Sequence, residues 1–76
     1  MSTPRTKAIL QLLGRGREPK LAATVLKILG ASTFEEANAT YDAVGAAERA
    51  SIDEVVERVT ANASAAFLLS VDRESS

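Results

Sequence analysis

Asp53 and Glu57, two carboxylates four residues apart, have a type and spacing that could support chemistry. Residues four apart lie on the same side of a helix, where two carboxylates can share a divalent cation or work as an acid and a base. The chain contains no histidine and no cysteine, so the commonest metal ligands and catalytic nucleophiles are missing. A chain of 76 residues also has little material for a cleft that would desolvate the pair. We therefore expect no enzymatic activity, no metal and no other cofactor.

Four basic residues near a glycine-containing loop are the second candidate: Arg15, Arg17, Lys20 and Lys27. Together with the N–H groups at the start of the next predicted helix, they could bind phosphate groups. However, Glu18 lies among them, no aromatic side chain accompanies them for base stacking, and the net charge of the chain is −1. The loop also lacks the Gly-Lys-Ser/Thr ending of a Walker A motif. Solvated side chains are the favoured interpretation, and a nucleic-acid or anion site is the alternative.

The charge of the chain is divided between its two halves. Residues 1–30 contain six basic residues and one acid, whereas residues 31–76 contain nine acids and three basic residues. Such a division favours an anionic partner for the first half, or two halves that attract each other within or between chains. We expect the basic and acidic halves to form separate regions of the surface.

Alanine-rich segments separated by glycine and proline predict an all-α fold, a small bundle of four helices in a single domain of residues 1–76. The first helix runs from Pro4 to Gly14, and the second, with the widest apolar face, runs over residues 19–29 and is expected at the centre. A capping box at Ser32 or at Thr33 begins the third helix, which continues to about Val44.

The last segment predicts a short helical turn at residues 46–50, a break near Ser51, and then a long C-terminal helix over residues 52–71. A frayed tail is expected at about residues 73–76. The long helix carries a second apolar face, away from its main stripe, made of Ala61, Ala65, Leu68 and Leu69. This face is a candidate protein interface, most simply in a two-fold dimer. Coverage by the first helix explains it equally well.

These observations predict a cytoplasmic, non-catalytic protein-interaction module, an adaptor or regulator that binds another protein or a second copy of itself through its long C-terminal helix. The alternative is a small nucleic-acid-binding regulator that contacts phosphates through the basic half. A helix-turn-helix is disfavoured, because the third helix would bring Glu35, Glu36 and Asp42 against the phosphates. Neither a membrane nor a small-molecule substrate is expected as a partner.

Overall fold

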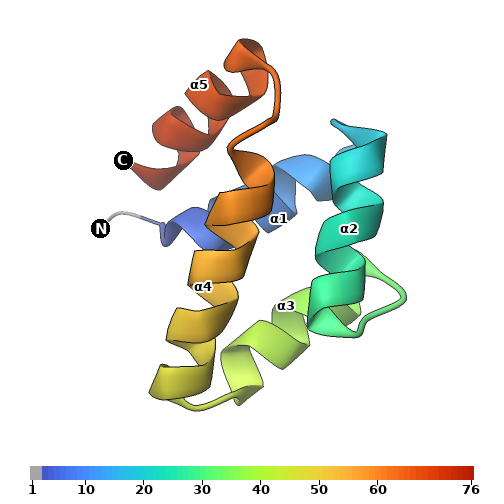
Figure 1. Cartoon of the computed structure of the whole chain (residues 1–76), viewed down its shortest axis with the longest axis vertical. Coiled ribbons are helices and arrows are strands. Elements are labelled where there is room, and N and C mark those ends of the chain that lie inside the picture. Colours follow the sequence, from blue (N-terminus) through green and yellow to red (C-terminus); the bar gives the residue numbers. More distant parts are fainter. Residues whose placement is uncertain (1–2) are drawn as a thin grey trace.

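The computed structural model describes residues 3–76, which form five α-helices and, over that range, no β-strand (Figure 1). The helices are α1 (Arg5–Gly14), α2 (Pro19–Leu29), α3 (Phe34–Ala43), α4 (Ala46–Thr60) and α5 (Ala65–Ser75). The all-α prediction is confirmed. The predicted count of four is wrong, and the last helix, with 11 residues, is not long. Residues 1–2 of the predicted domain lie outside the described residues.

The ends of α2 and the start of α3 follow the local sequence signals. Pro19 is the first residue of α2, and Gly30 ends that helix in the left-handed conformation, with φ 64°. At the start of α3, the Thr33 hydroxyl accepts a hydrogen bond of 3.1 Å from the backbone N–H of Glu36. The second of the two capping alternatives is therefore the one that the chain uses.

The predicted break near Ser51 is wrong, because α4 passes through this residue without interruption. The Ser51 hydroxyl donates instead to the carbonyl of Ala47, one turn earlier, at 3.4 Å. The predicted break rests on Ala46, Ala47 and Ala50, which point away from the main apolar face of residues 52–71. These alanines are exposed in the structure, where alanine remains a good helix former.

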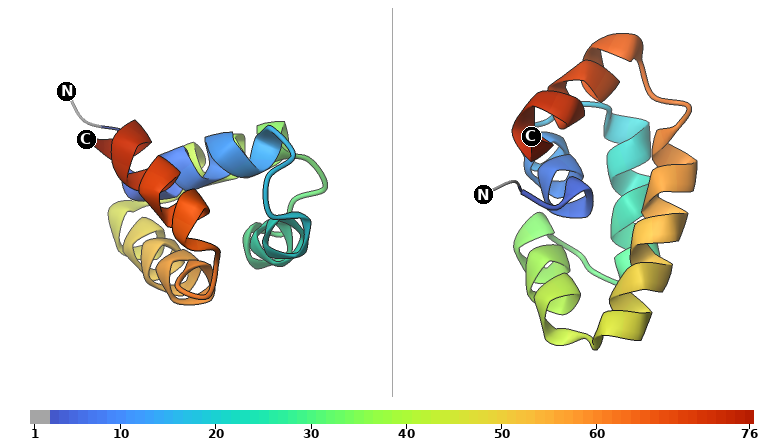
Figure 2. Two further views of the ribbon diagram at one scale, coloured as in Figure 1. Left: turned by 90° about the horizontal axis from the view of Figure 1, so that it is seen from above. Right: turned by 90° about the vertical axis from the view of Figure 1, so that its left-hand side faces the viewer.

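The break in the C-terminal segment falls ten residues later, between Thr60 and Ala65. Ser64 caps the start of α5, since its hydroxyl accepts a hydrogen bond of 3.2 Å from the backbone N–H of Phe67. α5 then continues to Ser75, so that residues 73–75 are helical where a frayed tail was predicted. The predicted long helix is thus two helices that take different directions (Figure 2).

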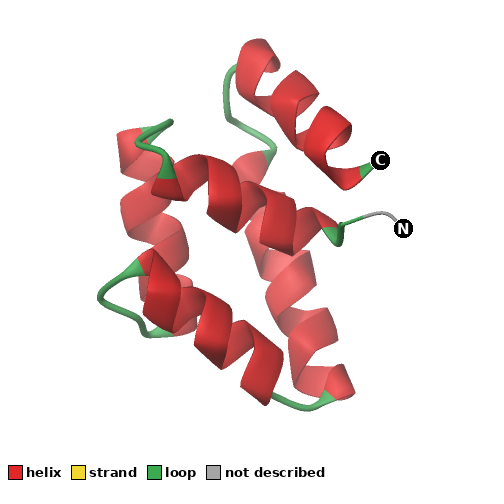
Figure 3. Ribbon diagram, turned by 180° about the vertical axis from the view of Figure 1, so that it is seen from behind, coloured by secondary structure: helices red, strands yellow, loops and turns green. Residues whose placement is uncertain are grey.

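The central helix is α1 rather than α2. It packs against all four other helices, most extensively against α5 and α3. Viewed from behind, α1 and α3 lie in front of α2 and α4, and α5 lies at the opposite end from α3 (Figure 3). The wide apolar face of α2 is only partly covered, because α2 lies at the edge of the bundle. Six of the ten residues of α1 are buried: Thr6, Ala8, Ile9, Leu10, Leu12 and Leu13.

Candidate functional site

The four residues of the candidate interface are divided between two elements. Ala61 is the residue that ends α4, whereas Ala65, Leu68 and Leu69 belong to α5. Leu68 is half-buried, and the two alanines are exposed. Leu69 is 54% exposed and is the one exposed large hydrophobic residue among residues 3–76. The continuous face predicted along one helix does not exist, but Leu69, at its C-terminal end, is open to solvent.

We define the outer face of α5 as the exposed residues that surround Leu69 on that helix. At about 100° per residue, Arg73 lies about 40° to one side of Leu69 and Asp72 about 60° to the other side. Both are exposed. The N-terminal part of the face is small and apolar, and the C-terminal part is charged. Its members are Ala65, Ala66, Leu69, Asp72 and Arg73.

The opposite side of α5 attaches the helix to the rest of the molecule through two apolar side chains. Phe67 and Val71 are both fully buried, and α1 is the helix on which α5 chiefly packs. The Arg17 guanidinium lies 5.4 Å from the centre of the Phe67 ring and donates a hydrogen bond of 3.2 Å to the Ser70 hydroxyl. Phe67 thus belongs to the hydrophobic core.

Ion pairs join the basic first half of the chain to its acidic second half. Arg5 pairs with Glu57 at 2.6 Å and with Asp72 at 2.5 Å, and these two carboxylates raise the pKa of Arg5 above its ordinary value. Lys7 pairs with Asp42 at 2.9 Å.

Arg15 pairs with Glu74 at 3.1 Å, which adds a second contact between the first half and α5. Since opposite charges from the two halves lie side by side, the expected separation into a basic and an acidic region is wrong. The division of charge operates within the molecule, and it does not by itself support a binding role.

The four basic candidates for an anion site do not form one patch. Arg15 pairs with Glu74, and Arg17 contacts Ser70 and Phe67, so both face α5. Lys20 and Lys27 are exposed on α2 and take part in no ion pair within residues 3–76. Seven residues separate these two lysines, which places them about 10 Å apart along the helix axis. Only the two lysines keep their charge free for an external anion.

The two carboxylates with catalytic spacing are used separately. Glu57 pairs with Arg5, while one oxygen of Asp53 accepts hydrogen bonds of 2.6 Å from both the Thr6 and the Tyr41 hydroxyls. Burial and the hydrogen bond to Asp53 raise the pKa of Tyr41 to about 12. Within residues 3–76 no group of three or more acidic side chains is placed to hold a metal ion. The arrangement joins α1, α3 and α4.

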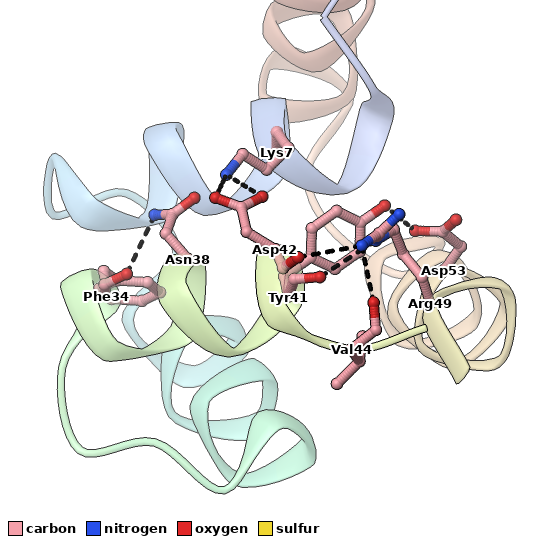
Figure 4. Close-up of polar contacts among 8 residues, drawn as sticks. All are labelled: Lys7, Phe34, Asn38, Tyr41, Asp42, Val44, Arg49 and Asp53. Carbon is pink, nitrogen blue, oxygen red and sulfur yellow. Dashed lines mark hydrogen bonds and ion pairs between the residues drawn. The ribbon is translucent and has the colours of Figure 1, made fainter. Parts of the chain in front are cut away.

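Arg49 reinforces this junction and was missed by the sequence interpretation. Its guanidinium donates to the carbonyls of Tyr41, Asp42 and Val44 at 3.1, 3.1 and 2.8 Å (Figure 4). These carbonyls lie at the end of α3, where a helix leaves acceptors without partners. An arginine shortly after a helix end is the sequence signal that would have indicated such a cap.

A surface depression of about 330 Å³ lies between the start of α2 and the end of α4. Its lining mixes apolar side chains such as Leu21 and Val59 with polar ones such as Lys20. Neither Asp53 nor Glu57 lines it. No helix within residues 3–76 has the length and apolar character needed to cross a membrane.

Comparison with known proteins gives no relative: no family model, no curated protein and no solved structure matches this chain.

Proposed function

We propose that this chain is a non-catalytic protein-interaction module that self-associates through the outer face of α5. The observation that carries the proposal is the exposure of Leu69, 54% of whose surface faces solvent on a helix that buries two other apolar side chains. A single exposed leucine is common on protein surfaces, but this one continues into the exposed methyl groups of Ala65 and Ala66. Small residues beside a leucine allow two helices to approach closely.

The size of the face sets the strength of association that we expect. α5 has 11 residues and is therefore about 16 Å long, so that two copies would share a contact at the lower end of the range for specific complexes. Contacts of this size give weak, reversible association. The module would then dimerise at high micromolar concentration and exchange readily.

The alternative, a regulator that binds nucleic-acid phosphates, is less well supported. Two of its four basic residues, Arg15 and Arg17, already contact groups of α5. The two free lysines lie on α2 without an aromatic side chain for stacking. Two isolated cations give few phosphate contacts, and affinity for nucleic acid rises with their number.

Replacement of Leu69 by glutamate tests the proposal, because a carboxylate cannot be buried at the centre of an apolar contact without a large desolvation cost. We expect the wild-type chain to show a rise in weight-average mass towards the dimer in sedimentation equilibrium up to high micromolar concentration. Leu69→Glu should remain monomeric over that range.

Ala23→Glu is the matched control, since it adds the same charge at an exposed helical position on α2. It should dimerise as the wild type does. A wild-type chain that stays monomeric at all concentrations, or an equal loss of dimer in both variants, would contradict the proposal.

A further inference from the structure

The four residues that connect α4 to α5 differ from the other connections between helices. These residues, 61–64, which we call the hinge, contain neither glycine nor proline, whereas Gly16, Gly30 and Gly45 lie in the other three connections. Glycine and proline break helices, and alanine, which supplies two of the four hinge residues, is the best helix former. The apolar pattern of the sequence also predicts one helix through this segment. The local sequence of the hinge is therefore compatible with a continuous helix.

α5 is attached to the first part of the chain rather than to α4. Its apolar side packs chiefly on α1. Within residues 3–76, every side-chain hydrogen bond or ion pair that joins residues 64–76 to another segment comes from residues 5–18. The pairs are Arg5 with Asp72, Arg15 with Glu74, Arg17 with Ser70 and Glu18 with Ser64. α4 thus holds α5 mainly through the covalent connection of the hinge.

The axis of α5 points away from the other helices at its N-terminal end. α5 begins at the top of the molecule and runs down towards the N-terminal end of α1 (Figure 1). A helix that continued backwards from Ala65 along this axis would leave the molecule, and the side view agrees (Figure 2). α4 of a second copy could therefore lie on this extension without meeting the other helices.

We propose that two copies of this chain exchange α5, so that α5 of each copy packs on α1 of the other. In each copy the hinge becomes helical, and α4 and α5 join into one helix of residues 46–75, about 45 Å long. The exchanged α5 buries the same apolar side chains and re-forms the same contacts with residues 5–18, now of the other copy, so that little is lost by the exchange. This inference goes beyond the proposed function, since the exchange uses the buried side of α5 and leaves Leu69 on the outside.

The exchange should be slow in the folded protein, because α5 must leave α1 before it can bind another copy. Refolding from urea avoids this barrier, since α5 of each chain then meets its own α1 and that of a neighbouring chain at the same stage of folding. The exchanged dimer should therefore form on refolding at high protein concentration and persist after dilution. The weak association through Leu69, in contrast, reverses quickly on dilution.

Cross-linking identifies which chain supplies the α5 that packs on each α1. The chain contains no cysteine, so Arg15→Cys and Glu74→Cys each introduce a single thiol, at positions whose side chains form an ion pair at 3.1 Å. A short bismaleimide is the reagent, since it bridges thiols that lie too far apart for a disulfide. When equal amounts of the two variants are refolded together, a link between residues 15 and 74 can join only two different chains. We expect this link in the dimer fraction, where mass spectrometry of the digested protein detects it.

A pair of positions that does not exchange supplies the matched control. Lys7 and Asp42 form a similar ion pair, at 2.9 Å, between α1 and α3. A refolded mixture of Lys7→Cys and Asp42→Cys should give severalfold less covalent dimer than the mixture at residues 15 and 74. Equal yields from the two mixtures would overturn the exchange.

The length of the hinge gives a second test. Deletion of Asn62 and Ala63 leaves too few residues for α5 to fold back on its own α1, so this variant should be a dimer at concentrations where the wild type is monomeric. Insertion of Gly-Ser-Gly-Ser after Asn62 interrupts the continuous helix and should prevent the exchange. Size-exclusion chromatography with light scattering measures the mass, and circular dichroism shows whether each variant is folded. A folded deletion variant that stays monomeric would overturn the exchange, and if this variant does not fold, the cross-linking of the full-length chain decides.

Leu69→Glu, added to both cysteine variants, separates the exchange from the proposed function. It should abolish the association that reverses on dilution and leave the link between residues 15 and 74 unchanged, because Leu69 lies outside the contact of α5 with α1. Loss of the reversible dimer without any such link supports the proposed function and overturns the exchange. A link between these residues in a chain that shows no reversible dimer supports the exchange and contradicts the proposed function.

Discussion

The two ends of the molecule attach their outer helices in different ways. At one end, α3 buries Ala37 and is held by hydrogen bonds, most of them part-buried, of Tyr41 to Asp53 and of Arg49 to the last carbonyls of the helix. At the other end, α5 is held mainly by two buried apolar side chains and by exposed ion pairs, with one part-buried hydrogen bond from Arg17 to Ser70. The first kind of attachment fixes one geometry, whereas the second tolerates small shifts, because apolar contacts and exposed ion pairs have little directional preference.

This difference indicates which end is available to a partner. The polar groups at the α3 junction are satisfied by one another, and Tyr41 is 4% exposed, so little there is left to bind. The α5 end keeps an exposed leucine and two charged groups, Arg73 and Glu18, that form no ion pair within residues 3–76. Three predictions about stability, in addition to the two about association, test whether the two ends differ as described.

The largest effect is expected from Asp53→Ala. This change leaves the hydroxyls of Thr6 and Tyr41, which are 2% and 4% exposed as residues, without their shared acceptor. Two nearly buried donors without partners should lower the free energy of unfolding by about 2–3 kcal/mol. Urea denaturation followed by circular dichroism measures this loss.

Asp42→Ala is the control for this change. Asp42 is also a carboxylate that links α3 to α1, but its side chain is 63% exposed and pairs with Lys7. Removal of an exposed pair should cost less than about 1 kcal/mol. Equal losses for Asp53→Ala and Asp42→Ala would show that the part-buried hydrogen bonds stabilise the junction no more than an exposed ion pair does.

The sequence predicts most of the helices but not how they are attached. Gly30 and Thr33 identify helix ends because their signals are local and depend only on the backbone around them. Whether a helix lies at the centre depends on how many neighbouring helices pack on its apolar face. The pattern of apolar residues along the helix is the same whether one neighbour or three cover that face. The wide apolar face of α2 therefore leads to the wrong prediction that α2 is the central helix.

The candidate site shows the same limit. The sequence leaves open whether the face that contains Leu69 is exposed or is covered by the first helix. In the structure Leu69 is exposed, because α1 covers the opposite side of α5. The sequence indicates only that Glu18 is an acid among the four basic candidates. Its left-handed backbone and its contact with Ser64 follow from the tertiary fold. Pairing between the charged halves was one option for the division of charge, and composition alone cannot tell attraction within a chain from attraction between chains.

A smaller effect is expected from alkaline pH, and it acts at the α3 junction. The pKa of Tyr41 is raised from 10.0 to about 12 by burial and by Asp53, so the fold favours the neutral phenol. The stabilisation is complete below pH 10 and is lost as the pH rises from about 10 to about 12. A pKa raised by two, at about 1.4 kcal/mol for each, corresponds to about 2.8 kcal/mol in full, of which about 2 kcal/mol is lost by pH 12.

Urea denaturation at several pH values between 9 and 12 measures this loss, and Tyr41→Phe should show less of it, because it keeps the ring without the titrating group. Tyr41 is the only tyrosine and the chain has no tryptophan, so ultraviolet absorbance of the phenolate reports its ionisation directly. A phenolate that forms with a midpoint near pH 10 in the folded protein would show that the junction does not restrain Tyr41.

The smallest effect is expected at the α5 end, from the double change Asp72→Asn and Glu74→Gln. The two changes remove the partners that Arg5 and Arg15 have on α5, whose side chains are 62% and 33% exposed. Exposed pairs contribute little, so the free energy of unfolding should fall by less than about 1 kcal/mol. Concentrated salt should reduce the difference between the variant and the wild type, because it screens the pairs in the wild type.

Amide hydrogen exchange, measured at concentrations where the chain is monomeric, locates this effect within the molecule. Backbone amides of α5 should exchange severalfold faster in the double variant, while those of α3 should not change, because local opening depends on the contacts of the helix that opens. Glu54→Gln, which removes the remote pair with Arg58 on α4, should leave α5 exchange as it is. If exchange in α3 increased as much as in α5, the two ends would open together, and the difference in attachment between α3 and α5 would be wrong.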